Sequence, residues 1–214
     1  MSETIFNLLL NIFILILGFI FALFLEKIKK PVLVIEKGEI GFMGPNDPLK
    51  RREAAFPYIL VKNKRLPLFW GYFLKREPAY ACKAYISFLD LDFNILFEKE
   101  MFGRWTSNPQ PYVQKVIIDN TPYFQLKVIQ DSFDIHPDET ASLNTIVKIK
   151  DDEMCYGWSD ESYLNGWENP NWKINKKKFL IKIRLRTGGQ EFVKLIGIEN
   201  RHNFKKVKFF SVSD

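Results

Sequence analysis

An apolar run near the N-terminus constrains this chain of 214 residues more than any other feature. Residues 5–25 carry no charge, and only Asn7, Asn11 and Gly18 among them are not apolar. A helix of this length reaches about 31 Å at roughly 1.5 Å per residue, close to the hydrocarbon thickness of a bilayer. A secretory signal peptide has a shorter apolar region between a basic start and a small-residue cleavage site, which this N-terminus lacks. We therefore predict an uncleaved transmembrane anchor with its basic flank over residues 1–30.

The charged residues beside this run predict its orientation. Lys27, Lys29, Lys30 and Lys37 follow it, whereas only Glu3 and the terminal amine precede it. Because Lys and Arg are retained on the cytoplasmic side, we expect the short N-terminus outside and the rest of the chain in the cytoplasm. The lack of Asn-x-Ser/Thr sites and the low count of 2 Cys agree with this orientation. The prediction is a single-pass membrane protein whose soluble domain is cytoplasmic.

Polar and small residues share one stripe of the predicted membrane helix. Asn7, Asn11, Gly18 and Ala22 fall within roughly 60° of one another at 100° per residue. Small residues allow a second helix to approach closely in lipid, and Asn amides form hydrogen bonds between helices. Two interpretations stay open: the stripe is a helix–helix contact, or the two Asn side chains simply face the headgroups of the outer interface.

The apolar pattern changes from helical to alternating after Pro31, which ends the helix because it has no N–H to donate. Short alternating or apolar stretches bounded by turn residues predict strands. The paired glycines in residues 187–190 predict a hairpin turn between strands at 179–186 and 191–198, because such turns require positive φ. The other expected strands cover residues 32–35, 58–61, 79–89, 124–130, 143–149 and 205–212.

This succession of short strands predicts one all-β domain over residues 31–214, built as an antiparallel β-sandwich. One short helical turn is expected over residues 160–165, with Asp160 as its N-cap and Gly166 after its end. The segments expected to be loops are residues 38–56, 63–77 and 102–122.

Several short motifs in the soluble part resemble one group of proteins. The motifs are Val61-Lys62-Asn63, residues 81–86, Gly103-Arg104-Trp105, Cys155-Tyr156 and Asn169-Pro170, followed by a two-strand ending that closes on Asn200. The pattern is similar to that of uncharacterised single-span archaeal and bacterial membrane proteins with an immunoglobulin-like sandwich. The resemblance implies the fold and the topology, and it implies no activity and no functional residue.

No catalytic or metal-binding constellation is present in the sequence. The nucleotide-binding glycine motifs and the G-x-S-x-G hydrolase motif are absent, and His136 and His202 lie far apart in the chain. Cys82 and Cys155 are interpreted as two buried thiols, with an inter-sheet disulfide as the alternative for an exported domain. We therefore predict a protein that is not an enzyme and that uses no cofactor or metal.

Charge is strongly segregated along the second half of the chain. Residues 131–170 hold 10 acids and 2 bases, whereas residues 171–214 hold 12 bases and 3 acids. The basic residues of interest are Lys176, Lys177, Lys178, Lys182, Arg184 and Arg186. The last three alternate along one strand, so we expect them on one face of a sheet. That face could bind anionic lipid or an acidic protein, with nucleic acid unfavoured, or it could be an ordinary solvated surface.

Residues 155–172 are rich in aromatic and polar side chains. The candidate ligand or partner residues are Trp158, Tyr163, Trp167 and Trp172. Aromatic rings beside carboxylates and amides are typical of sugar sites and of protein interfaces. The alternative is that the loop folds its aromatic side chains over an open end of the sandwich, and the size of three Trp residues favours this burial.

These observations predict a membrane-tethered, non-enzymatic interaction module. The β domain would be presented at the inner face of the membrane to a protein partner or to another copy of the chain. The alternative is a surface-displayed domain that binds carbohydrate or another ligand, which requires the opposite topology.

Overall fold

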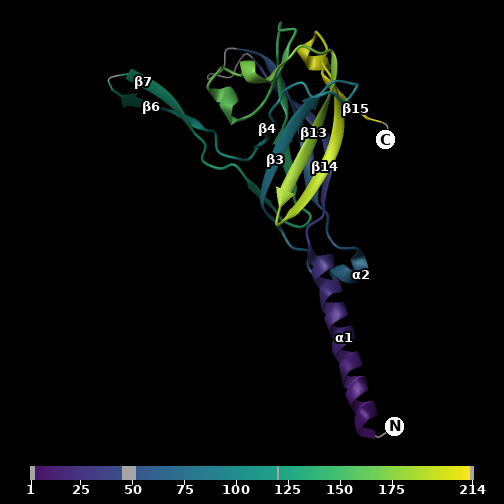
Figure 1. Cartoon of the computed structure of the whole chain (residues 1–214). Helices are drawn as coiled ribbons and strands as arrows, with labels where there is room; N and C mark the ends of the chain where they lie inside the picture. Colours follow the sequence, from purple (N-terminus) through teal and green to yellow (C-terminus); the bar gives the residue numbers. More distant parts are fainter. Residues whose placement is uncertain (1–2, 45–51, 120, 213–214) are drawn as a thin grey trace.

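The computed structural model of the chain describes residues 3–44, 52–119 and 121–212 and shows a mostly β protein behind one apolar helix (Figure 1). Strands hold 45% of the residues and pair in antiparallel sheets, which confirms the predicted all-β class. Helix α1 (Glu3–Lys29) extends away from one end of the sheets. Its segment Ile5–Lys29 is long and apolar enough to cross a membrane, and the large apolar side chains of residues 5–24 are exposed.

The first sheet is centred on β2. Strand β1 pairs along one side of β2, and β9 and β10 follow one another along its other side. Apart from β1, the strands of this sheet follow the order β12-β11-β10-β2-β9-β5 from one edge to the other. The strands are β1 (Leu33–Met43), β2 (Ala54–Asn63), β5 (Arg104–Trp105), β9 (Thr140–Asn144), β10 (Ile146–Ile149), β11 (Cys155–Gly157) and β12 (Lys173–Ile174).

A proline inside β2 explains two irregularities of this sheet. Pro57 has no N–H for the ladder, and the pairing of β1 with β2 shifts register between Lys37 and Ile40, where Ile40 faces Pro57. On its other side, the Pro57 carbonyl accepts a 2.8 Å hydrogen bond from the hydroxyl of Thr145. Thr145 separates β9 from β10, so the single strand predicted over residues 143–149 is two strands. Gly38 lies at this shift. A larger residue does not fit there, because a Cβ would come within 2.2 Å of the Tyr58 carbonyl oxygen.

The second sheet runs β15-β14-β13-β3-β4, with β8 also paired to β3. The predicted hairpin turn is confirmed, since Thr187 pairs with Gln190 and both Gly188 and Gly189 have positive φ, at 50° and 75°. The strands are β3 (Ala79–Leu89), β4 (Met101–Phe102), β8 (Phe133–Ile135), β13 (Lys178–Thr187), β14 (Gln190–Glu199) and β15 (Lys208–Phe210).

One buried cluster joins the two sheets. It contains Ile59 and Leu143 from the first sheet and Ile86 and Ile181 from the second, all at 0% exposure. The sheets therefore pack against each other across this core. A second cluster, which includes Val147, Trp158 and Trp167, covers the opposite face of the first sheet, because Val147 alternates with the core residue Ile146 along β10.

A two-stranded hairpin stands apart from both sheets. Strands β6 (Tyr112–Ile118) and β7 (Thr121–Lys127) pair only with each other among the described residues, and Figure 1 shows them projecting sideways from the domain. We call this hairpin the arm. The short helices are α2 (Leu68–Gly71), η1 (Asp160–Tyr163), η2 (Pro170–Trp172) and η3 (Phe204–Lys206).

Several sequence predictions are corrected by these elements. The three expected loops contain regular structure: β1 runs to Met43 and β2 begins at Ala54, α2 lies within 63–77, and β5, β6 and the start of β7 lie within 102–122. Residues 45–51 of the first loop are outside the described residues. The N-cap of η1 is Ser159 rather than Asp160, because the Ser159 N–H donates to the Ser162 hydroxyl at 3.1 Å in a capping box.

Candidate functional site

The end of α1 is attached to the β domain by specific contacts rather than by a free linker. The Glu77 N–H donates to the Lys29 carbonyl at 2.7 Å, and the Arg76 guanidinium donates to the Lys30 carbonyl at 2.6 Å. These bonds satisfy carbonyls that every helix leaves unpaired at its C-terminus. The rings of Phe24 and Trp70 also pack edge to face, with their centroids 5.9 Å apart.

Asn63, the last residue of β2, holds this junction together from inside. Its side chain is fully buried and accepts a 3.2 Å hydrogen bond from the Val32 N–H. Its amide group donates to the carbonyls of Glu77 and Ile135 at 3.0 and 3.1 Å. One side chain therefore ties the start of β1, the segment after α2 and the end of β8 together.

Large apolar side chains are exposed beside this junction. Leu68, Phe69, Tyr72 and Phe73, on and just after α2, are 70–79% exposed, whereas Leu66 beneath them is buried. A contiguous group of this kind on a domain surface marks an interaction site. Its place next to the end of a membrane-length helix favours the membrane interface, where aromatic residues concentrate. We call residues 64–76 the juxtamembrane segment.

This segment lies within residues 63–77, which the sequence predicts to be a loop, and it is not among the predicted site residues. The missed signal is a run of apolar and aromatic residues at 66–74 that is flanked by Lys64-Arg65 and Lys75-Arg76. Basic residues on both sides of an aromatic stretch are typical of segments that lie in the membrane interface.

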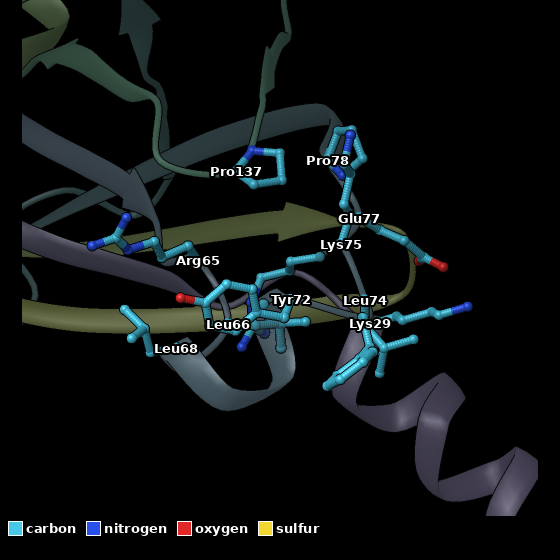
Figure 2. Close-up of a pocket in the computed structure, with 13 residues that line it drawn as sticks. Lys29, Arg65, Leu66, Leu68, Tyr72, Leu74, Lys75, Glu77, Pro78 and Pro137 are labelled. Atoms are coloured by element: carbon cyan, nitrogen blue, oxygen red, sulfur yellow. The ribbon is translucent and has the colours of Figure 1, made fainter.

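A pocket of about 900 Å³ opens between the juxtamembrane segment and the end of α1 (Figure 2). Its charged lining residues are Lys29, Arg65, Lys75, Arg76 and the single acid Glu77. Apolar side chains complete the lining, and they are Leu66, Leu68, Tyr72, Phe73, Leu74, Pro78 and Pro137. The pocket thus combines excess positive charge with apolar walls.

The basic residues predicted on one strand lie on β13, but they do not form one open patch. Lys182, Arg184 and Arg186 alternate with buried residues, so they share the outer face of the second sheet. Arg184 is paired with Glu100 and Glu191, and Arg186 with Glu191 at 2.8 Å. Both guanidinium groups also lie over the Tyr85 ring, at 5.1 and 5.4 Å. Their charge is therefore largely compensated within the domain.

The remaining basic candidates lie far from α1. Strand β13 runs from Lys178 to the turn at Gly188-Gly189, and the next residue, Gln190, lines a small cavity with Lys27 and Lys30. Ten strand residues span about 30 Å, so Lys176, Lys177 and Lys178 lie at the end of the sheet opposite to α1 (Figure 1). The six residues are consequently spread along the length of the domain.

The aromatic candidates are integrated into the packing of the domain. Trp158 and Trp167 are each 4% exposed, and both contact Phe56 on the outer face of the first sheet. Trp172 is 8% exposed and belongs to the core between the sheets. Tyr163 is half-buried, with its ring 5.3 Å from that of Trp158. The aromatic loop (residues 155–172) therefore covers the outer face of the first sheet with Trp158, Tyr163 and Trp167, whereas Trp172 fills the core between the sheets.

The cysteines, the buried Lys148 and the histidines lie in different environments. Cys82 and Cys155 are free and buried, and burial raises the pKa of each thiol to about 12, which makes both unreactive. Lys148, also buried, has a lowered pKa because of desolvation. His136 and His202 are exposed. In the part of the chain that the structure describes, no three His, Cys, Asp or Glu side chains are gathered as metal ligands.

The stripe of Asn7, Asn11, Gly18 and Ala22 lies on exposed helix, with open space around Gly18. Its role as a helix–helix contact stays a prediction. No protein-family model, curated protein or solved structure matches the chain, so the candidate site is defined by its own geometry.

Proposed function

We propose that the chain is a membrane-tethered, non-enzymatic interaction module. In this proposal α1 spans the membrane, the β domain lies at its cytoplasmic face, and the juxtamembrane segment rests on the bilayer. Support for the orientation comes from the bases Lys27, Lys29 and Lys30 at the domain end of α1, since bases are retained in the cytoplasm. Support for the resting position comes from the exposed apolar residues of α2 beside the same helix end.

The arm is the observation that supports binding to another protein. Directly opposed residues in an antiparallel pair lie on the same face, and the register places Ile117 opposite Pro122, Lys115 opposite Phe124, and Val113 opposite Leu126. One face of the arm is therefore apolar except for Lys115. An isolated two-stranded hairpin is marginally stable in water, so a partner that covers this face would stabilise it. We propose a protein partner or a second copy of the chain as the occupant.

Photo-crosslinking from the arm tests this function. A photoreactive residue at Phe124, on the apolar face, is expected to give a discrete cross-linked protein in membranes. The same residue at Gln125, on the opposite face, is the matched control and should give several-fold less product. A product at twice the mass of the chain would identify a second copy as the occupant. Equal yields from the two positions, or no protein product from either, would contradict the proposed role of the arm.

We also propose that the two sheets are a variant of the immunoglobulin-like sandwich. The shared core between two antiparallel sheets supports this assignment, as does the hairpin of β13 and β14 within the second sheet. The division of one strand into β9 and β10 at Thr145 and the separate arm are the departures from a minimal domain of that type.

A further inference from the structure

The pocket between the juxtamembrane segment and α1 contains positive charge that the described residues do not neutralise. Lys29 and Lys75 have no ion pair among the described residues, and Arg65 approaches only Asp138, at 3.6 Å. Glu77 is the single acid of the lining, against four bases. Lys29, Arg65 and Lys75 all line the pocket; in Figure 2 Lys75 lies between the other two, whose charged ends point away from each other. The pocket is thus suited to a ligand that carries an anionic group and an apolar part.

The position of the pocket along α1 matches the headgroup layer of a bilayer. If residues 5–25 fill the hydrocarbon core, Lys29 lies four residues further, or about 6 Å beyond it. The headgroup region on each side of a bilayer is roughly 5–7 Å deep. Lys29 is therefore at the depth of lipid phosphates, and the other bases of the pocket line the same opening. The exposed apolar side chains of α2 lie beside the same end of α1, where Trp70 contacts Phe24.

We propose that this pocket binds the phosphate-bearing headgroup of an anionic phospholipid from the cytoplasmic leaflet. Arg65 and Lys75 would contact the phosphate, and the apolar lining around Leu68 and Tyr72 would contact the glycerol and the first acyl carbons. Arg76 is a positioning residue, because its guanidinium already donates to the Lys30 carbonyl. The bound lipid would fix the angle between the β domain and the membrane. This inference rests on the part of the proposed function in which α1 spans the membrane.

Native mass spectrometry of the full-length chain in detergent tests the proposal. The probes are phosphatidylglycerol and phosphatidylcholine with identical acyl chains, offered together at equal concentration. Wild-type protein is expected to retain one phosphatidylglycerol with a preference of at least about tenfold, since each base near a lipid surface contributes about 1 kcal/mol. The double variant Arg65→Gln/Lys75→Gln is expected to lose this preference and to bind both lipids equally.

The matched control is Lys176→Gln/Lys177→Gln, which removes the same charge from the end of the sheet opposite to α1 and should keep the preference. Equal retention of the two lipids by the wild type, or an equal loss in both double variants, would overturn the proposal. Displacement of phosphatidylglycerol by an equal concentration of inorganic phosphate would also overturn it, because the site would then bind free anions. Lipid preference in detergent does not depend on topology, so its failure is distinguishable from a failure of the membrane orientation.

Discussion

Replacing Trp167 by Ala is expected to lower the free energy of unfolding by about 3–5 kcal/mol. The Trp167 ring is 4% exposed and packs edge to face against Phe56 and Trp158, at 5.3 and 5.9 Å. Trp167 has a positive φ of 79°, and Ala keeps the same Cβ, so the variant changes packing without changing the backbone penalty. Urea unfolding of the full-length protein in detergent, followed by circular dichroism, measures the loss.

The control for this variant is Tyr72→Ala, which removes a large aromatic side chain that is 79% exposed. Its effect on the stability of the β domain is expected to stay within about 0.5 kcal/mol, as for other surface substitutions. The outcome that contradicts the buried role is a Trp167→Ala protein of wild-type stability that has lost binding to a glycan or a protein partner. In that case the aromatic loop would be a ligand platform.

Replacing Asn63 by Ala is expected to cost about 3 kcal/mol, because three backbone groups lose their hydrogen-bond partner in a buried site. Hydrogen exchange at the Val32 amide should also become faster, since its acceptor is the Asn63 side chain. Both quantities are measured on the full-length chain. Asn144→Ala, which removes one hydrogen bond that the Asn144 side-chain oxygen accepts from the Thr106 hydroxyl, serves as the comparison and should cost under about 1 kcal/mol. An Asn63→Ala cost no larger than this comparison would show that the junction does not depend on Asn63.

The sequence predicts well the elements whose pattern is local. The alternation over 79–89 predicts β3, and Gly188-Gly189 predicts the turn between β13 and β14, because each rests on neighbouring residues. The sequence predicts a loop over residues 102–122, because the strand pattern there is weak. The reason is that the apolar residues of β6 do not face a core. The interruption at Thr145 depends on Pro57, 88 residues away, which no local pattern reports.

The sequence predicts some features of the candidate sites and misses others. Lys182, Arg184 and Arg186 do share one face, but the ion pairs of Arg184 and Arg186 with Glu100 and Glu191 depend on how β13 is placed beside β14 and the residues before β4. The juxtamembrane segment was recognisable by composition, yet its meaning depends on contact with the end of α1, which only the fold brings about. Because Arg184 and Arg186 are ion-paired and Lys176, Lys177 and Lys178 lie at the end of the sheet opposite to α1, the expected membrane contact moves from β13 to residues 64–76.

The proposed function depends most on which side of the membrane the β domain occupies, and cysteine labelling measures this directly. The native Cys82 and Cys155 are buried and free, so they should add little background. A single exposed cysteine made by His202→Cys is placed at the end of the domain far from α1 and treated with a membrane-impermeant maleimide. The proposed orientation predicts labelling only after the cells are permeabilised, with the protein retained in the membrane pellet. Labelling of His202→Cys in intact cells would place the β domain outside and would contradict the proposed function.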